Sequence, residues 1–409
     1  MTTPDRRQVL LGAGGAAASI ALSPELLAAP RRLSAPVRLA LIGAGRQGRA
    51  IMGELAKFTD VTLGAVCDSD ERRLKGASRR APGATLEADS AKVMADSSID
   101  GVIIATPTHQ HTDIALAAIA AGKHVYCEAP LAHTLEDARK IAVAAREGGK
   151  VFQVGHEGRA NPVYTLARGF VRSGAIRNTV AMRAQDHQKG SWRTPTDDPA
   201  RDKFLNWRLD PEVSLGLIGE LGTHQFDVMT WFTGLRPRAV RAHGALLTWD
   251  DGRKEPDTVQ VEFDYDGGVL GSWSSTLTSS YEGRYELING SDGTVKLAWS
   301  HGWMFKEADA PTLGWEVYAN RQRFHDDEGI TLIADATKLA SQGKLTDGIG
   351  LPHPPVYYGL ETFLQSVTDN AEVSTPAEAG VQALAVALRA REALASGTTV
   401  EIPEEDFKV

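Results

Sequence analysis

The sequence predicts an α/β protein with a doubly wound parallel sheet in its first part and a strand-rich second part. Three observations predict this class. Short apolar segments alternate with helical patterns over about 120 residues, between positions 36 and 155. A glycine-rich turn follows the first of these segments at Gly43. From about Arg183 onward, alternating strands are separated by turn sequences such as Asp266-Gly-Gly268, which are typical of hairpins.

Composition and charge exclude several classes of protein. The chain has 409 residues, a formal net charge of −8 and 23% charged residues. An acidic balance without a basic tract argues against binding to nucleic acid or to an anionic membrane surface. The two cysteines, Cys67 and Cys127, cannot form a disulfide scaffold, and we expect both to be free and buried.

Residues 1–35 are predicted to be an export signal and a linker. Arg6 and Arg7 precede an apolar run from Val9 to Leu22, which is shorter than the roughly 20 residues of a membrane-spanning helix. The glycines inside this run follow no strand, so they are not a phosphate-binding turn. The arginine pair resembles a twin-arginine signal. We therefore expect recognition by the twin-arginine export machinery, no stable membrane anchor, and a periplasmic or secreted protein.

The first predicted strand ends in a dinucleotide-binding fingerprint. The apolar segment 37–42 enters a glycine-rich turn, and a helical pattern starts at once. The first glycine permits the tight turn, the second lets a phosphate approach the backbone, and the third lets helix and strand pack closely. The helix N-terminus offers free amides to a pyrophosphate. The predicted cofactor-binding residues of this turn are Gly43, Gly45, Arg46, Gln47 and Gly48.

The second predicted strand, residues 61–67, ends at Asp68, twenty positions after Gly48. A carboxylate there can accept hydrogen bonds from both ribose hydroxyls and repels a 2′-phosphate, so we expect NAD rather than NADP. Arg72 and Arg73 are close enough in sequence to weaken this preference. The alternative interpretation is a turn in an α/β domain without a cofactor.

Four motifs together resemble the glucose–fructose oxidoreductase / inositol dehydrogenase (Gfo/Idh/MocA) family. They are the glycine turn, "CDSD" (67–70), "ATPTHQHTDIALAAIAAGKHVYCEAPLA" (105–132) and "GELGTHQFD" (219–227). The resemblance implies a Rossmann domain over 36–155 and a substrate-binding and oligomerisation domain over 156–409. The second domain is then an open, mainly antiparallel sheet whose exposed face joins subunits into a homo-oligomer. A helix over about 376–396 is expected to pack back across it.

The resemblance also assigns roles to individual residues. Thr106, Pro107 and His111 match a loop on the nicotinamide side of the cofactor. Glu128-Ala129-Pro130 matches a triplet that is usually Glu-Lys-Pro in the family. Alanine can neither donate a proton nor hold a charge, so the usual dehydrogenase mechanism cannot be carried over intact. Some NAD-dependent glycosidases of this superfamily similarly lack the lysine, which points towards glycosides, although a loss of activity would also explain Ala129.

His224 is the predicted catalytic base, because its ordinary pKa lies near neutrality. The family's Asp-x-x-x-His pair falls on Glu220 and His224, with Asp227 further along the same segment. On a helix, Glu220 would share a face with His224, orient its ring and raise its pKa. The alternatives are a metal site and a purely structural histidine. One such pair without further ligands is weak evidence for a metal, and we expect none.

The stretch 185–207 is rich in groups that recognise sugars. Its indoles can present flat faces to a pyranose, and its charged side chains can bond hydroxyls; the alternative is an ordinary polar loop with two core tryptophans. The predicted substrate-binding residues are Asp186, His187, Trp192, Arg193, Trp207 and Asp227. Further candidates are His156 with its neighbour Glu157 near the cofactor, Glu128 at the substrate, Lys189 in place of the missing lysine, and Tyr281 as a proton donor.

These observations favour a redox-neutral enzyme that acts on a sugar or glycoside with tightly bound NAD. An exported enzyme meets no supply of NAD, so it must restore the cofactor's oxidation state within each cycle. We therefore expect glycoside cleavage through transient hydroxyl oxidation and elimination. One alternative is a conventional NAD(P)-dependent sugar or polyol oxidoreductase. The other is a non-catalytic protein that binds a sugar or nucleotide.

Overall fold

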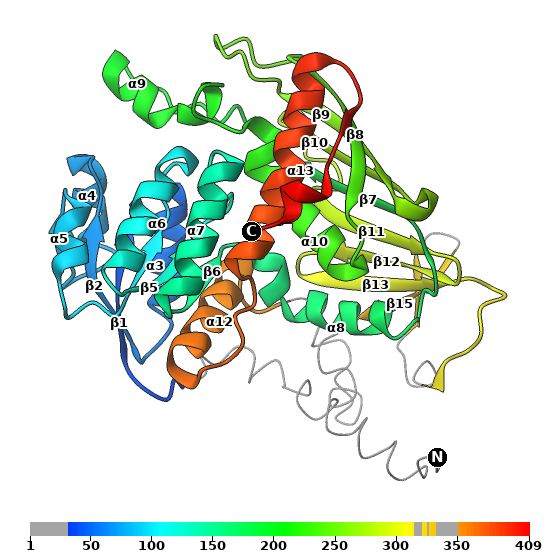
Figure 1. Cartoon of the computed structure of the whole chain (residues 1–409), viewed down its shortest axis with the longest axis horizontal. Coiled ribbons are helices and arrows are strands. Elements are labelled where there is room, and N and C mark those ends of the chain that lie inside the picture. Colours follow the sequence, from blue (N-terminus) through cyan, green and yellow to red (C-terminus); the bar gives the residue numbers. More distant parts are fainter. Residues whose placement is uncertain (1–31, 315–320, 325–326, 333–350) are drawn as a thin grey trace.

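The computed structural model of the chain describes residues 32–314, 321–324, 327–332 and 351–409 (Figure 1). The predicted export signal lies almost entirely outside these described residues and stays a prediction. Among the described helices, none is both long and apolar enough to cross a membrane. The described chain forms two sheets, one of six strands and one of ten, which confirms the predicted fold class.

The first sheet is parallel throughout, in the order β3-β2-β1-β4-β5-β6. Its strand order reverses between β1 and β4, and ligands of doubly wound sheets bind beyond the carboxyl ends of the strands at such a point. The strands are β1 (Val37–Ile42), β2 (Val61–Cys67), β3 (Thr85–Glu87), β4 (Gly101–Ile104), β5 (His124–Cys127) and β6 (Phe152–Val154). The helices between them are α3 (Arg46–Leu55), α4 (Glu71–Ala77), α5 (Ser90–Ala95), α6 (His111–Ala120) and α7 (Leu135–Gly148).

Apolar runs produce these buried strands, and polar side chains start the helices between them. All four residues of β4 are buried, as expected for a parallel strand covered on both faces. Asp70 caps α4 by accepting the amide of Arg72, and Thr134 caps α7 by accepting the amide of Asp137. Cys67 and Cys127 end β2 and β5 as free, buried thiols, which confirms that prediction.

The second sheet has the order β14-β15-β13-β12-β11-β7-β10-β9-β8-β16. Its described pairs are antiparallel except β7 with β10. The strands are β7 (Thr179–His187), β8 (Pro237–Ala245), β9 (Thr258–Tyr265), β10 (Leu270–Thr276), β11 (Arg284–Gly290), β12 (Gly293–Ala298), β13 (His301–Lys306), β14 (Arg321–Phe324), β15 (Asp327–Leu332) and β16 (Val400–Glu401).

Helices cover one face of the second sheet. They are α8 (Pro162–Arg172), α10 (Thr223–Thr233) and α13 (Ala377–Ser396). Along β9, buried Val259, Val261 and Phe263 alternate with exposed polar residues on the other face. That other face is the one predicted to join subunits, which stays a prediction.

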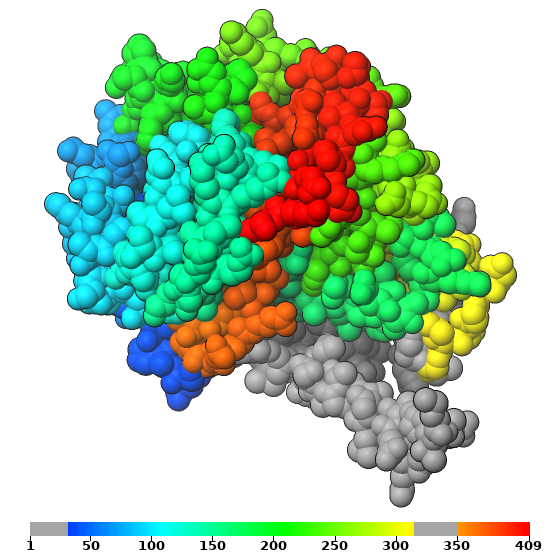
Figure 2. All heavy atoms as spheres, in the orientation of Figure 1, coloured from blue at the N-terminus to red at the C-terminus, as the bar shows by residue number. Residues whose placement is uncertain are grey.

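Two late helices complete the core of the first domain. Tyr357, Leu360 and Phe363 of α12 (Pro355–Asp369) pack in one cluster with Leu39 and Leu41 of β1. The helix predicted over 376–396 is present as α13, which lies against α7 as well as β8. In Figure 2 the red C-terminal segment fills the junction between the cyan and green parts of the surface. The core of the first domain therefore contains residues from both sides of the predicted boundary at residue 155.

One segment of the second domain reaches back over the first. Helix α9 (Pro199–Leu205) extends from the main body towards α4 in Figure 1. Arg201 of α9 forms an ion pair with Asp70 at 2.9 Å, and the guanidinium of Arg73 lies 4.6 Å from the ring centre of Phe204. This helix, which we call the strap, closes one side of the site described next.

Candidate active site

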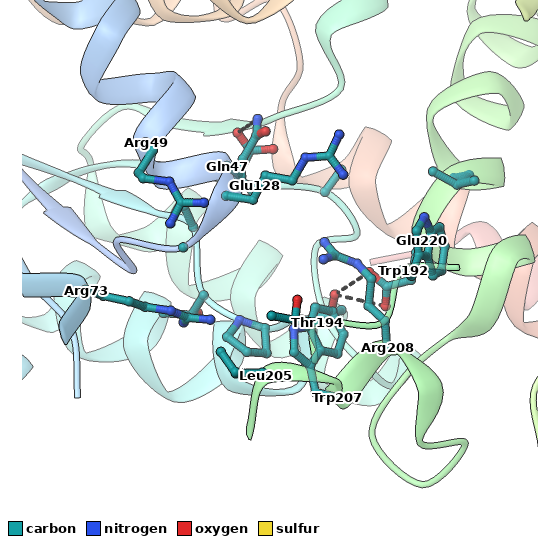
Figure 3. A pocket seen from close by; sticks show the side chains of 18 of the residues that line it. Gln47, Arg49, Arg73, Glu128, Trp192, Thr194, Leu205, Trp207, Arg208 and Glu220 are labelled. Carbon is teal, nitrogen blue, oxygen red and sulfur yellow. Dashed lines mark hydrogen bonds and ion pairs between the residues drawn. The ribbon is translucent and has the colours of Figure 1, made fainter. Parts of the chain in front are cut away.

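A cavity of about 1090 Å³ lies between the two domains. One wall is formed by residues that follow the strands of the first sheet, among them Gly45, Thr106 and Glu128. The opposite wall belongs to the second domain, and Figure 3 shows Trp192, Arg208 and Glu220 there. This position is the one that a doubly wound sheet uses for ligands.

The glycine turn fits a dinucleotide pyrophosphate. Gly43 has a φ of +99°, and a Cβ on it would lie 2.5 Å from the carbonyl oxygen of Ala105. A Cβ on Gly48 would lie 1.9 Å from the carbonyl oxygen of Gly43, so both positions require glycine. Helix α3 starts at Arg46 with no side-chain cap and no acidic residue in its first turn. Its first amides are therefore free for a phosphate, and Gly45, Arg46 and Gln47 line the cavity.

Asp68 stands at the end of β2, as predicted, but its carboxylate is engaged within the chain. It accepts the backbone amides of Ala44 at 2.7 Å and Asp70 at 2.8 Å. The side chain is buried, and Asp68 is not among the residues that line the cavity. The bond to Ala44 holds Asp68 to the glycine turn. The predicted contact of Asp68 with a ribose stays a prediction.

The loop after β4 lines the expected nicotinamide end of the cavity with Thr106, Pro107, Thr108 and His111. The ring nitrogens of His111 lie 2.8 Å from the carbonyl oxygen of Pro130 and 3.0 Å from that of Thr106. Burial lowers the pKa of His111. The buried imidazole of His111 lies between two backbone carbonyls and positions this loop against the Glu-Ala-Pro triplet.

Glu128 lines the cavity as a carboxyl group that resists ionisation. Burial raises its pKa to about 8, and the neighbouring Glu157 adds to this shift. Its Oε1 atom accepts a hydrogen bond from Gln47 at 3.0 Å, so it stands directly beside the glycine turn. Glu157 also lines the cavity, and burial raises its pKa to about 7. Near neutral pH, Glu128 is mainly a proton donor.

His224 lines the cavity as a neutral imidazole, and the predicted pKa near or above its ordinary value is wrong. Burial lowers the pKa of His224 well below 6.5, and the charges of Arg284 and His156 lower it further. Its Nδ1 atom has no hydrogen-bond partner among the described residues. His156 does not line the cavity, and its predicted contact with the cofactor or substrate stays a prediction. Its ring instead meets His224 edge to face at 5.4 Å.

Glu220 does not orient His224, contrary to the sequence prediction. Its carboxylate accepts the Thr108 hydroxyl at 3.1 Å and the Leu215 amide at 3.3 Å, and lies 3.9 Å from Nε of Arg208. The reason is local, because residues 218–222 form a π-helical turn rather than the α-helical turn that places i and i+4 on one face. Glu220 is buried, which raises its pKa, and it joins the two domains through Thr108.

Three predicted substrate residues, Asp186, Trp192 and Trp207, do line the cavity. Sequence reasoning missed two arginines beside them. The guanidinium of Arg208 lies 4.6 Å from the ring centre of Trp207 and 5.8 Å from that of Trp192. Arg284 is paired with Asp186 across strands β11 and β7, with Nε 3.7 Å from the carboxylate. The only sequence signal for Arg208 was its place directly after Trp207.

The other predicted substrate residues do not line the cavity. His187 follows Asp186 on strand β7, so it faces the other side of the sheet and contacts Ser274 Oγ at 3.0 Å. Arg193 pairs with Asp202 at 3.0 Å and Asp251 at 3.6 Å.

Asp227 forms a buried ion pair and does not line the cavity, so its predicted contact with substrate stays a prediction. Its buried carboxylate binds Arg159 through two nitrogens, at 2.7 and 2.9 Å.

Lys189 and Tyr281, the other catalytic candidates, lie outside the cavity lining, and their catalytic roles stay predictions. Lys189 is exposed and forms an isolated bridge with Thr278, while its neighbour Gln188 lines the cavity. Tyr281 is 77% exposed and lies in the turn between β10 and β11. Ala129 does line the cavity, so the position of the family's lysine is filled by a methyl group. Within the described parts of the chain, no group of three or more potential metal ligands comes together.

Comparisons with known proteins agree with this geometry. Residues 37–156 match the family described as "Oxidoreductase family, NAD-binding Rossmann fold", and residues 189–402 match "Oxidoreductase family, C-terminal alpha/beta domain". An inositol 2-dehydrogenase of an Arthrobacter species is 31% identical over 273 residues, which are 65% of this chain and 75% of that protein. A 1,5-anhydro-D-fructose reductase of Ensifer adhaerens is 25% identical over 377 residues, 89% of this chain and 98% of that protein.

A levoglucosan dehydrogenase provides a sequence and a structural comparison. The enzyme of Pseudarthrobacter phenanthrenivorans is 28% identical over 230 residues, 51% of this chain, and the match spans only 57% of that relative. The structure of a levoglucosan dehydrogenase with NADH and levoglucosan has a TM-score of 0.72 at 23% identity, covering 90% of this chain and all of that one. This likeness shows the fold. The two family matches together cover well over half of the chain. They show that the chain belongs to the Gfo/Idh/MocA family of NAD-binding oxidoreductases.

Proposed function

We propose that the chain oxidises a hydroxyl group of a sugar or polyol and that His224 accepts the hydroxyl proton. The observation that carries the proposal is a buried, neutral imidazole on a cavity that is also lined by two indoles and by the glycine turn. Bound NAD supplies the acceptor for the hydride that leaves the hydroxyl-bearing carbon. The relatives named for levoglucosan, inositol and anhydrofructose support a cyclic polyhydroxylated substrate.

The chain's own residues bind the substrate, accept the proton and hold the walls of the cavity together. Trp192 and Trp207 provide apolar faces for the C–H side of a ring, and Arg208 and Asp186 provide charged hydrogen-bonding groups. A neutral imidazole has one free nitrogen lone pair, which is what a base for a hydroxyl proton needs. Thr108 and Glu220 hold the two walls of the cavity together through their hydrogen bond.

The more specific proposal is redox-neutral cleavage of a glycoside. Oxidation at C3 of the sugar gives a ketone that acidifies the C2–H bond. Loss of that proton expels the C1 substituent, water then adds to the unsaturated ketone, and return of the hydride to C3 restores NAD. The net reaction is hydrolysis.

Two features of the cavity support this cycle. Burial raises the pKa of Glu128 and lowers the pKa of His224, so that near neutral pH the first is a protonated acid and the second a neutral base. A conventional dehydrogenase has no leaving group to protonate, whereas elimination does. Ala129 also supplies no charge that would stabilise a released ketone product.

The predicted export of the chain is a further argument for this cycle, and we propose export as part of it. Outside the cytoplasm a dehydrogenase that released NADH would stop after one turnover. An enzyme that returns the hydride to the same substrate needs no second acceptor.

Turnover in heavy water is expected to label the product. With a glycoside that carries an activated leaving group, deuterium should appear at C2 of the released sugar, because the C2 proton is lost and replaced in each cycle. The measurement is mass spectrometry of the sugar together with absorbance at the NADH band. Product without deuterium at C2, or NADH that rises with product, would restore the conventional oxidoreductase. A flat NADH signal without product would favour the binding protein.

Glu128 is expected to impose an alkaline limit on turnover of glycosides with poor leaving groups. Its pKa of about 8 means that the carboxyl is protonated below pH 8 and loses its proton above it, so the rate should fall about tenfold per pH unit beyond that point. Glu157 raises this pKa and Arg208 lowers it. The Glu128→Gln variant should lack this alkaline limb, whereas Glu212→Gln should keep it, because Glu212 is exposed and does not line the cavity. A limb that persists unchanged in Glu128→Gln would exclude Glu128 as the acid.

A further inference from the structure

Glu157 is a carboxyl group on the cavity wall that has no partner among the described residues. Three other carboxyl groups line the cavity, and each is held by a hydrogen bond or an ion pair described above, those of Glu128, Asp186 and Glu220. Figure 3 shows Glu128 beside Gln47, which donates a hydrogen bond to it. The side chain of Glu157 forms no hydrogen bond and no ion pair within the described chain, although it lines the same cavity. Its carboxylate is therefore available to a ligand.

The turn that carries Glu157 is fixed to the helix that carries His224. Glu157 begins the 3-10 helical turn η2 (Glu157–Ala160), which follows the carboxyl end of β6. Arg159 of this turn binds Asp227 of α10 through two nitrogens, at 2.7 and 2.9 Å. The glycine of the turn also packs on α10, because a Cβ there would lie 2.7 Å from a valine side chain of that helix. The two side chains therefore line one cavity from elements that are held together.

Groups from three neighbouring strands and loops govern the ionisation of Glu157. Burial raises its pKa to about 7, and the positive charge of Arg284 on β11 opposes this shift. The negative charge of Glu157 in turn raises the pKa of Glu128, which follows β5, and of the buried Tyr126 hydroxyl in β5. Two buried carboxyl groups that interact in this way favour one negative charge between them. Near neutral pH the pair therefore holds one proton, and that proton lies mainly on Glu128.

We propose that the Glu157 carboxylate is the base that removes the C2 proton in the glycoside cleavage proposed above, on which this inference rests. His224 accepts the proton of the C3 hydroxyl, and C2 is the adjacent carbon of the same ring. The elimination therefore needs a second base that is fixed to the same elements as the first. The other carboxyl groups have different partners, because Glu128 carries the proton for the leaving group and Asp186 and Glu220 lie beside arginines.

The protons and electrons of this step balance within the carboxyl pair. Glu157 takes the proton from C2, the electron pair of that C–H bond forms the C1=C2 double bond, and the bond from C1 to the leaving oxygen breaks. Glu128 protonates the leaving oxygen, so the pair still holds one proton and one negative charge. Addition of water reverses these roles, because Glu128 takes a proton from the water while Glu157 returns one to C2. No oxidant is needed beyond the one that the oxidation at C3 already uses.

Proton exchange at C2 and hydride transfer at C3 can be measured separately. The probe is the 4-nitrophenyl pyranoside that the wild-type protein cleaves fastest, in heavy water. Deuterium at C2 of the sugar reports the first step, and the NADH band in a stopped-flow single turnover reports the second. Glu157→Gln should slow deuterium entry at C2 by about 10²- to 10⁴-fold, the range for loss of a positioned base, while NADH still forms at close to the wild-type rate. Glu157→Asp keeps a carboxylate on a shorter arm and should restore part of the exchange.

The acid side of the pH profile provides a second readout. Because Glu157 must be ionised to act as a base, exchange at C2 should fall about tenfold per pH unit below pH 7. Hydride transfer should not share this limb, since His224 stays neutral there. Glu212→Gln is the control, because Glu212 is exposed and does not line the cavity, and it should leave both steps and the limb unchanged.

The outcomes separate this inference from the function on which it rests. Wild-type protein that cleaves the glycoside without labelling C2 would remove the elimination mechanism, and with it any base for C2. When the wild type does label C2, exchange in Glu157→Gln within about tenfold of the wild-type rate would overturn the role of Glu157. Equal losses of the C2 and C3 steps in Glu157→Gln would also overturn it, because formation of NADH needs no base at C2.

Discussion

Replacing His224 with alanine is expected to lower turnover by about 10²- to 10⁴-fold, the range for loss of a positioned general base. The reason is that His224 is a neutral, buried imidazole on the cavity wall, whereas Lys189 and Tyr281 are exposed and lie elsewhere. NAD content should not change, because the glycine turn that holds the pyrophosphate belongs to the other wall.

Single-turnover kinetics with a sugar substrate would measure the effect. His187→Ala is the matched control, since His187 does not line the cavity and contacts Ser274 instead. Because burial lowers the pKa of His224 well below 6.5, its protonation should not reduce the rate between pH 8 and pH 6. Near-normal turnover of His224→Ala would move the base elsewhere, with Glu157 as the next candidate on the cavity wall.

Replacing Asp227 with alanine is expected to destabilise the fold by about 3–5 kcal/mol, the usual cost of breaking a buried ion pair from one side. The side chain of Asp227 is 1% exposed and that of Arg159 is 14% exposed, so the variant leaves a guanidinium charge with little access to water. The measurement is the free energy of unfolding in urea.

The control for Asp227→Ala is Glu54→Ala, which breaks the more exposed pair of Glu54 with Lys57 and should cost below about 1 kcal/mol. Unchanged stability of Asp227→Ala, combined with a raised KM for the sugar, would return Asp227 to the substrate site. Loss of stability without a change in KM would support the structural role.

Features that depend on neighbouring residues were predictable from the sequence. The glycine turn, the strand before it and the helix after it are set by local sterics and by a continuous apolar run. The same holds for α13, whose start is marked by Thr375-Pro376 and whose end at Gly397 has a φ of +68°. The cofactor end of the site followed from these elements.

Features that depend on distant pairing were not predictable. Arg284 reaches the cavity because β11 pairs with β7 in a register that sets it opposite Asp186. No local signal in the sequence specifies this register. The prediction that Glu220 orients His224 was wrong for a different reason. It assumed α-helical spacing, whereas residues 218–222 form a π-helical turn.

The packing of α12 has a consequence for the order in which the protein matures during synthesis. Helix α12 contacts α3, whose N-terminus faces the pyrophosphate site, and its apolar side chains complete the cluster around β1. Ribosomes release a chain from its N-terminus, so the first 155 residues emerge long before these partners exist. Until residues 355–384 have been added, the nascent first domain carries uncovered apolar surface and an unsupported α3. The fingerprint is translated among the first fifty residues, but the side chains that complete the core of its domain come from residues 355–384.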